Sequence, residues 1–457
     1  MRLTFDRGTL VLHGAEACPG LLLPEAQDDP RVGAVRVPAH HYHLVVRSLV
    51  AQGRAFEDQA RGYQELDLSA HPAPPEPRPY QGEALAAWRA ARRRGVVVLP
   101  TGTGKTLVAV LAIRETRRSA LVVVPTLDLL HQWHALLAAH FGGAEAIGAV
   151  GGGEVRPTEI TVTTYDSAYL HLDRLGNRFG LVVFDEVHHL AGPAFQDAAR
   201  MSLAPFRLGL TATPGEEGDP RWSRVTELLG PVVYRREITE MAGEWLSPYE
   251  ARRVVVELPP AERAAYEAAR ARFRAFVDQA GIRLGAPGGW GRFLEASSRS
   301  AEGREALLAW REQRRLALAA PRKLEELAAI LERHRDERLI VFTHDNETVF
   351  AVSRRFLVPA ITHRTKGPER RAMLAGLRDG TTPVLATSRV LNEGVDLPAV
   401  GVAVVLSGSG TVREHVQRLG RILRPAPGKR ALLYELISAG TSEEATSARR
   451  REHDAYR

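Results

Sequence analysis

The sequence of 457 residues predicts an α/β fold built on two parallel sheets. Short runs rich in Val and Leu alternate with helical stretches, as in strands that are buried on both faces of a sheet. These runs form two series, and a long, mostly helical segment at residues 260–335 separates most of the second series from the first. At about 150 residues per domain, the length predicts about three domains.

The elements can be assigned in chain order. Residues 1–70 indicate a small α/β unit, with a strand at 3–12 and a helix at 40–52 whose apolar residues share one face. The proline-rich segment 71–77 predicts a linker. The strands of the first sheet are expected at 96–99, 121–124, 160–162, 181–184 and 208–210. Those of the second are expected at 254–258, 339–342, 384–386, 402–406 and 432–436.

These elements predict three regions, residues 1–75, 76–242 and 243–457, with a helical insertion at about 260–320 in the last. The composition, 44% hydrophobic and 25% charged, excludes a disordered chain. No uncharged apolar run is long enough to cross a bilayer, and residues 1–12 lack the pattern of a signal peptide. The single cysteine, Cys18, excludes internal disulfides and a cysteine-based zinc site. We therefore expect a cytoplasmic protein without a membrane partner.

The charge distribution favours a nucleic acid partner. Lys and Arg total 61 against 54 Asp and Glu, and only four of the 61 are lysines, which a coding bias would explain. The placement is more informative, because residues 261–323 hold 13 basic and 7 acidic side chains with interleaved aromatics. Such side chains grip phosphates and stack on bases. Arg292 and Trp290 are predicted DNA contacts, while Phe273 and Phe276 also fit the core of a helical bundle.

A phosphate-binding loop is predicted where the run 96–99 gives way to a helix. Glycines there let successive backbone N–H groups turn inward around phosphate oxygens, and the helix N-terminus adds donors. Lys105 is placed to reach the β- and γ-phosphates of ATP, and Thr106 to ligate Mg²⁺. Leu99 stands where the general motif has its first glycine. The predicted ATP-binding residues of the loop are Thr101, Gly102, Thr103, Gly104, Lys105 and Thr106.

An acidic pair, Asp185 and Glu186, follows the run 181–184. Ligands of parallel α/β sheets bind at the carboxyl ends of the strands, so Asp185 is predicted to hold Mg²⁺ and Glu186 to polarise the attacking water. Three further polar residues follow this strand and the next, and they are predicted to couple the nucleotide site to a second site: His188, Thr211 and Thr213.

These blocks, in this order, resemble the superfamily 2 helicases and translocases over residues 78 to about 436, and among them the XPB family. The strings that carry the likeness are residues 99–106, 185–190, 229–231 and 417–425. The resemblance implies two RecA-like motor domains, a damage-recognition-like N-terminal domain and a thumb-like helical insertion. It also implies an ATP-dependent 3′–5′ DNA helicase or translocase of DNA repair that uses Mg²⁺, acts on single-stranded or forked DNA and works with a nuclease partner.

The same resemblance implies further site residues. Arg78 and Gln81 fit the segment that reads the base of ATP, and Gly394 and Asp396 fit a second nucleotide contact. The residues that fit strand contacts are Pro125, Thr126, Gln132, Thr164 and Thr387. The residues that fit the element acting on the transferred phosphoryl group are Gln417, Arg421 and Arg424.

One segment departs from the family pattern. The family has an Arg-Glu-Asp element after the third motif, whereas residues 215–219 here contain no arginine. The strand-separating device is therefore expected to be weakened, with ATP hydrolysis unaffected. Two alternatives stay open from the residues alone: an ATP-dependent RNA helicase, and a DNA-binding ATPase clamp that does not separate strands.

Overall fold

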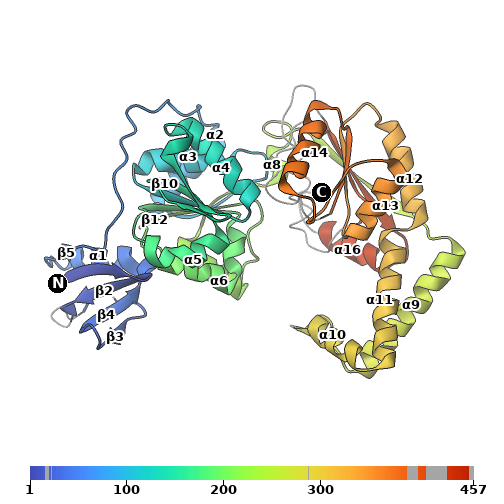
Figure 1. Ribbon diagram of the computed structural model, residues 1–457, viewed down its shortest axis with the longest axis horizontal. Coiled ribbons are helices and arrows are strands. Elements are labelled where there is room, and N and C mark those ends of the chain that lie inside the picture. The colour runs from blue at the N-terminus through green and yellow to red at the C-terminus, as the bar shows by residue number, and fades with distance from the viewer. Residues whose placement is uncertain (16–19, 22, 287, 389–399, 408–429, 452–457) are drawn as a thin grey trace. The chain divides into compact units, whose positions relative to one another are not determined.

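The computed structural model describes residues 1–15, 20–21, 23–286, 288–388, 400–407 and 430–451. The chain divides into two compact units, Met1–Glu237 and Ile238–Arg457 (Figure 1). Each contains a mainly parallel sheet covered by helices, which confirms the predicted α/β class. Within the described ranges, no helix combines the length and the apolarity that crossing a bilayer requires.

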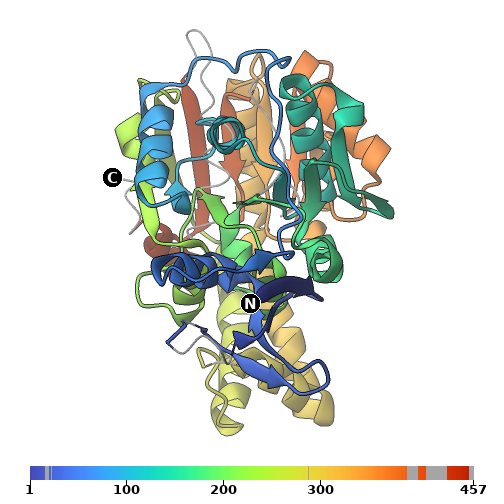
Figure 2. The same ribbon diagram turned by 90° about the vertical axis from the view of Figure 1, so that its left-hand side faces the viewer.

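The N-terminal part is a five-stranded sheet in the order β3-β4-β2-β1-β5, with α1 packed beside it (Figures 1 and 2). The single strand expected at 3–12 is wrong, because the chain makes an antiparallel hairpin there. Arg7 and Gly8 form its turn, with φ of 46° and 77°, and positive φ at both positions suits the twist of a two-residue hairpin. The bounds are β1 Arg2–Asp6, β2 Thr9–His13, β3 Gln27–Asp29, β4 Ala34–Pro38, α1 Tyr42–Ala51 and β5 Glu57–Asp58.

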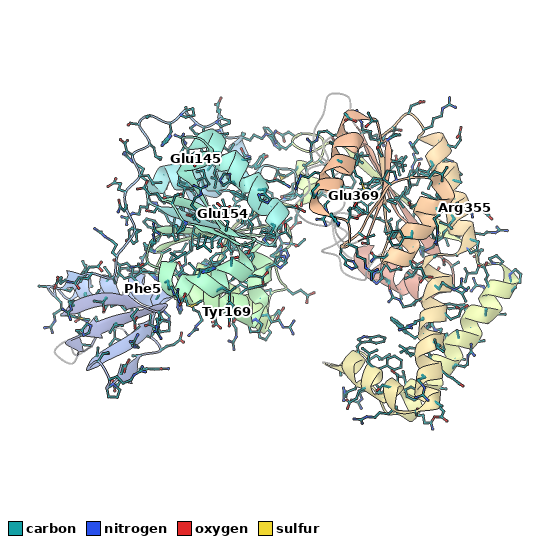
Figure 3. The ribbon with its side chains drawn as sticks, in the orientation of Figure 1. Phe5, Glu145, Glu154, Tyr169, Arg355 and Glu369 are labelled. Atoms are coloured by element: carbon teal, nitrogen blue, oxygen red, sulfur yellow. The ribbon has the colours of Figure 1, made fainter. Side chains whose placement is uncertain are left out.

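This small sheet shares its core with the rest of the first unit. Leu203 packs in the same apolar cluster as Leu3 and Val45. The Asn177 side chain donates to the Ala60 carbonyl at 3.0 Å. Phe5, labelled in Figure 3, lies close to Gly176, where an added Cβ would meet its ring at 3.0 Å. The N-terminal sheet is therefore docked by buried side chains.

The larger sheet of the first unit has eight strands in the order β13-β6-β12-β11-β7-β10-β8-β9, all parallel to their neighbours except β9. All five predicted runs are strands, and β8, β9 and β13 are additional. The strand bounds are β6 Arg94–Val98, β7 Ala120–Val124, β8 Ile147–Gly151, β9 Glu154–Arg156, β10 Ile160–Thr164, β11 Leu181–Asp185, β12 Phe206–Thr211 and β13 Val232–Arg235.

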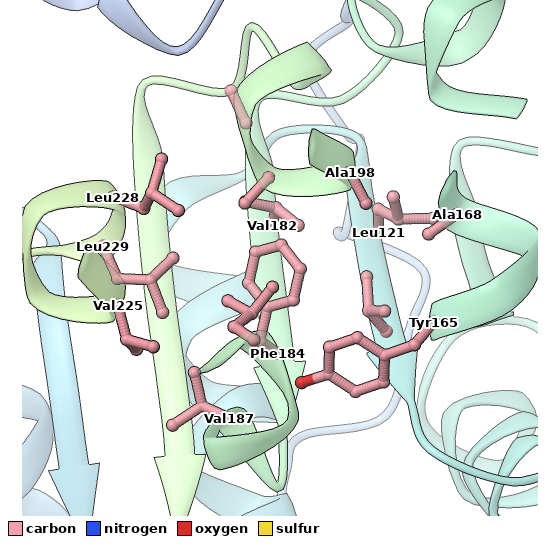
Figure 4. Packing of buried hydrophobic residues seen from close by; sticks show 14 of the residues in the cluster. Leu121, Tyr165, Ala168, Val182, Phe184, Val187, Ala198, Val225, Leu228 and Leu229 are labelled. Carbon is pink, nitrogen blue, oxygen red and sulfur yellow. The ribbon is translucent and has the colours of Figure 1, made fainter. Parts of the chain in front are cut away.

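Helices cover both faces of this sheet, with α2, α3 and α4 on one side and α5 and α6 on the other (Figure 1). Val182 and Phe184 of β11 point to the second face, where they meet Tyr165, Ala198 and Leu229 (Figure 4). Burial on both faces explains why the strand sequences are almost entirely apolar. The helix bounds are α2 Pro79–Ala90, α3 Lys105–Thr116, α4 Leu127–His140, α5 Tyr165–Leu175, α6 Pro193–Met201 and α7 Pro220–Leu229.

The second unit holds a six-stranded parallel sheet in the order β14-β19-β18-β15-β17-β16. The five predicted runs are again strands. The bounds are β14 Tyr249–Val256, β15 Leu339–Phe342, β16 Ala360–Ile361, β17 Val384–Thr387, β18 Val402–Val405 and β19 Ala431–Ser438. The helices beside them are α8 Ile238–Met241, α12 Pro321–Arg333, α13 Asn346–Phe356, α14 Gly367–Asp379 and α16 Ser442–Arg451.

The insertion is helical, as predicted. We call α9 Pro260–Gln279, α10 Gly289–Arg299 and α11 Ala301–Leu318 the thumb. α9 and α11 run side by side and project from the six-stranded sheet, while α10 turns away from them (Figures 1 and 2). Phe273 and Phe293 lie in the core between the helices, with ring centroids 5.3 Å apart. The core interpretation of Phe273 is thereby confirmed.

Arg207 is fully buried in β12, and within the described part of the chain its side chain donates to backbone carbonyls alone. Its guanidinium donates to the carbonyls of Ala199 at 3.0 Å and Leu228 at 3.3 Å, in the last turns of α6 and α7. It also donates to Ala204 and Ser202. A cation is favourable at the negative, C-terminal end of a helix dipole. Arg207 therefore caps the C-termini of both α6 and α7.

We predict that Arg207→Ala lowers the free energy of unfolding by about 3 kcal/mol or more, because buried carbonyls lose their donors. Urea unfolding measures the change. Arg221→Ala, at an exposed position of α7, is the matched control and should change stability by less than about 0.5 kcal/mol. Equal stability of the two variants would contradict the role assigned to Arg207.

Candidate nucleotide-binding site

The predicted phosphate loop joins the end of β6 to the start of α3. Gly102 and Gly104 have φ of 89° and 79°, in the left-handed region that favours glycine. A Cβ at Gly104 would stand 2.8 Å from the Gln81 Nε2 atom, so a side chain there would also clash. The loop thus has the glycine-dependent backbone that a phosphate cradle requires.

Lys105 is the first residue of α3, and 9% of it is exposed to solvent. Its ammonium donates to the carbonyls of Leu99 at 3.1 Å and Pro100 at 3.4 Å. The charge is therefore held over the loop by neutral acceptors, which a phosphate oxygen would replace with a stronger, charge-assisted bond.

Gln81 and Tyr80 of α2 brace this loop. The Tyr80 hydroxyl donates to the Thr103 carbonyl at 2.6 Å, and Gln81 Nε2 donates to the same carbonyl at 3.0 Å. Gln81 Oε1 accepts from the Arg78 backbone N–H at 2.9 Å, and Gln81 is 3% exposed. In this conformation both ends of the Gln81 amide are engaged within the protein, which argues against the predicted contact with the base of ATP.

The acidic pair lies two strands from the loop. β12 separates β6 from β11, and at about 4.8 Å per strand spacing the two strand ends are roughly 10 Å apart. Asp185 Oδ2 accepts from Trp133 Nε1 at 2.8 Å, and Oδ1 accepts from the Glu186 N–H at 3.0 Å. Glu186 has a φ of 47°, a strained value for a residue with a side chain, and such strain is found at functional sites.

Burial raises the pKa of Asp185 to about 6, and repulsion by Glu186 adds to the rise. The charge of Lys105 and the Trp133 hydrogen bond act in the opposite direction. A buried carboxylate with this environment favours a bound cation, because the cation would offset its desolvation.

The residues present fit ATP and a magnesium ion. Glu186 Oε2 and Thr101 Oγ1 are buried and lack a hydrogen-bond partner within the described part of the chain. Buried polar atoms normally have partners, so these two indicate groups that a ligand completes. Asp185 and Thr106 offer the hard oxygen atoms that Mg²⁺ prefers. These assignments stay predictions.

The three predicted coupling residues meet at the ends of β11 and β12. His188 Nδ1 lies 3.2 Å from Thr211 Oγ1, and the Thr213 N–H donates to the same hydroxyl at 3.1 Å. His188 is also 3.6 Å from Glu186 Oε2. A continuous polar contact therefore runs from the acidic pair to the next strand, although its coupling role remains a prediction.

The predicted strand contacts differ in their placement. Gln132 is exposed on α4. Thr126, next to Pro125, and Thr164 are the N-caps of α4 and α5, and each accepts a backbone N–H at 3.2 Å. Thr387 is 0% exposed and donates to the Ile361 carbonyl at 3.1 Å, so its placement argues against a DNA contact.

The remaining predicted residues divide into two groups. On the thumb, Trp290 is 38% exposed and Arg292 is exposed, so both are accessible. The others lie outside the described residues: Gly394, Asp396, Gln417, Arg421 and Arg424.

Two aromatic residues near the acidic pair were not predicted as part of this site. Trp133 follows Gln132, a predicted strand contact, but it was not itself assigned a role in the nucleotide site. It is 2% exposed, and its indole N–H donates to the Asp185 carboxylate. The Tyr165 hydroxyl donates to the Asp185 backbone carbonyl at 2.9 Å. A single apolar position in a helix carries no signal of such a partner 52 residues away.

Comparison with protein families defines the class of the molecule. Residues 74–216 match the res subunit of type III restriction enzymes, and residues 322–426 match the helicase conserved C-terminal domain. The helicase domain of Hef from Pyrococcus furiosus has a similar fold, with a TM-score of 0.55 and 22% identity over 81% of this chain and 97% of that one. The fold is that of a helicase with two helicase domains.

Residues 3–60 match the damage recognition domain of the xeroderma pigmentosum group B helicase. The chain is 41% identical to the DNA 3′-5′ translocase XPB2 of Sulfurisphaera tokodaii over 82% of its own length and 85% of that protein. It is 30% identical to the DNA 3′-5′ helicase XPB of Mycobacterium tuberculosis over 98% of its length and 76% of that protein. The chain therefore belongs to the XPB helicase family.

We predict that Asp185→Asn stabilises the nucleotide-free chain in a pH-dependent way. The folded pKa of Asp185, about 6, lies above the ordinary 3.8, so the folded carboxylate binds the proton more tightly than the unfolded one. Its ionised form therefore destabilises the fold above pH 6, and this cost disappears as the pH falls towards 4. Asp185→Asn has no charge to desolvate, so this destabilisation is absent. Its single side-chain oxygen can accept from either Trp133 or the Glu186 N–H, so one of these two hydrogen bonds is lost.

Thermal unfolding from pH 4 to pH 8 should show the stability of Asp185→Asn relative to the natural chain rising by roughly 1–3 kcal/mol across this range. Asp197→Asn, at an exposed position of α6, removes the same charge and is the control. A pH-independent difference for Asp185→Asn would contradict the raised pKa.

Proposed function

We propose that the chain is an ATP-dependent DNA helicase or translocase that moves 3′ to 5′ on single-stranded or forked DNA. The observation that carries the proposal is the acidic pair at the carboxyl end of β11, with the glycine loop at the carboxyl end of β6. Glu186 Oε2 has no hydrogen-bond partner in the described part of the chain. The XPB family includes a DNA 3′-5′ translocase and a DNA 3′-5′ helicase. Membership of this family is the basis for proposing DNA as the substrate and 3′ to 5′ as the direction of movement.

Phosphate binding would use the loop and the start of α3. The backbone N–H groups of Gly102 to Lys105 and the helix dipole favour the anionic phosphates. Lys105 would exchange the carbonyls of Leu99 and Pro100 for the β- and γ-phosphates. Asp185 and Thr106 would hold Mg²⁺, which supplies positive charge that neutralises the phosphates.

Hydrolysis would use Glu186 as the group that orients and deprotonates the attacking water. Its strained backbone lies at the end of β11, and its Oε2 atom has no hydrogen-bond partner in the described part of the chain, so a water molecule could donate to it. Arg421 and Arg424 are proposed to neutralise charge on the phosphoryl group. We further propose that the contacts among His188, Thr211 and Thr213 pass the state of the nucleotide to the strand-binding loops.

DNA binding would combine the loops of the motor sheets with the thumb. The thumb lies in the segment with an excess of basic side chains and exposes Arg292 and Trp290. DNA is favoured over RNA because both relatives are named for DNA. A role in repair and a nuclease partner are proposed from the XPB family resemblance.

We predict that single-stranded DNA stimulates ATP hydrolysis more than RNA does. A colorimetric phosphate assay with single-stranded DNA, forked DNA and RNA measures this. Glu186→Gln should still bind ATP with Mg²⁺ but hydrolyse it more slowly by a factor on the order of 10²–10⁴, as expected for loss of a positioned base. Lys105→Ala should lose turnover.

Three outcomes would contradict the proposal or one of its parts; the second needs a translocation assay and the third a nucleotide-binding assay. Stronger stimulation by RNA would favour an RNA helicase. ATP turnover with DNA but no movement along it would favour the clamp. Loss of ATP binding in Glu186→Gln would make that residue structural.

We also predict that translocation exceeds unaided strand separation. In the loop 215–219, Glu216 and Glu217 are exposed, and Asp219 is used as the N-cap of α7. Exposed carboxylates repel phosphates, and the family's arginine is absent from this loop. Displacement of a third strand from a triplex should therefore be efficient, and displacement of a long blunt-ended duplex strand poor. Robust unwinding of that duplex without a partner would contradict this prediction.

A further inference from the structure

A stack of aromatic rings reaches from the core of the thumb to its surface. Phe293 is fully buried, and its ring centroid lies 5.0 Å from that of Trp290, which is 38% exposed. Trp290 in turn lies 4.5 Å from Trp310 at an interplanar angle of 43°. One member of the pair is on α10 and the other on α11, so the contact between these two helices fixes their positions. An indole is thus presented to solvent on a rigid base.

The stack continues into a guanidinium group. Arg314 lies one turn after Trp310 on α11, with Cζ 4.8 Å from the centroid of the Trp310 ring. Indole rings and guanidinium planes are both side-chain surfaces on which nucleobases stack. The row from Trp290 to Arg314 therefore offers several planar groups, one after another, to which a base could stack.

Trp310 and Arg314 also line a groove of about 860 Å³ between the thumb and the ends of β15 and β17. Four arginines line it, among them Arg311 and Arg354, against the two carboxylates of Asp345 and Glu347. The Asp345 carboxylate already caps α13, where it accepts from the N–H and the hydroxyl of Thr348. The groove is therefore complementary to phosphates.

We propose that the Trp290–Trp310 pair stacks on an unpaired base of a DNA strand whose phosphates lie along the arginines of this groove. This inference rests on the proposed function and specifies it further. Bases inside a duplex already stack on each other, so only an unpaired base can use this surface without first being extruded. The thumb would thus recognise single-stranded DNA by its bases, in addition to attracting it by charge.

The test compares Trp290→Ala with Leu294→Ala, a matched loss of an exposed apolar side chain one turn further along α10. The full chain without nucleotide is titrated against a fluorescein-labelled single-stranded oligonucleotide, the same backbone carrying abasic sites, and a duplex. The natural chain should prefer the oligonucleotide with bases over the abasic one. Trp290→Ala should bind the former about 5- to 100-fold more weakly and lose that preference, while Leu294→Ala should keep it.

Duplex affinity should be the same for Trp290→Ala and the natural chain, and Trp290→Phe, which keeps a ring, should restore most of the preference for bases. Arg311→Ala should flatten the salt dependence of binding without removing that preference. A preserved preference in Trp290→Ala, or equal losses on single strand and duplex, would overturn the stacking site while leaving the proposed function intact. If the natural chain binds no DNA at all, both the stacking site and the proposed function fall.

Discussion

The buried carboxylate of Asp185 is the group on which the nucleotide site depends. Asp185 lies at the end of a strand that is apolar on both faces. Its carboxylate can stay ionised there only if hydrogen-bond donors and cations lie close to it. Trp133 from α4 and the Glu186 N–H supply the donors, and Lys105 supplies a positive charge. The indole of Trp133, the Glu186 N–H and the Lys105 ammonium all come from segments near the carboxyl ends of the central strands. Catalytic geometry and fold are thus linked through the desolvation of one side chain.

Much of the fold could be predicted because a parallel strand that is buried on both faces has an almost entirely apolar sequence, such as Leu181–Phe184. The hairpin at Arg7 and Gly8 was missed, since the apolar pattern on either side runs through the turn. Residue types also identified the loop and the acidic pair. The brace by Gln81, the indole of Trp133 and the burial of Thr387 depend on tertiary contacts, which local spacing does not encode.

Two kinds of arginine serve different purposes in this chain. Arg207 is buried among carbonyls and closes two helices of the first unit. Arg314 lies beside an indole at the surface of the thumb and lines an open groove. Both use the same planar fork of donors, because a guanidinium satisfies several acceptors and also stacks. The excess of arginine over lysine therefore has structural consequences, whatever its origin.

The shared core of the N-terminal sheet and the first motor sheet has a mechanical consequence. Leu203 belongs to the apolar cluster of the small sheet, although it lies between α6 and β12 of the larger one. The two sheets cannot separate without exposing that cluster to water, so we expect them to move together. An obstacle that stops the small sheet would then also stop the larger sheet, which carries the predicted phosphate loop.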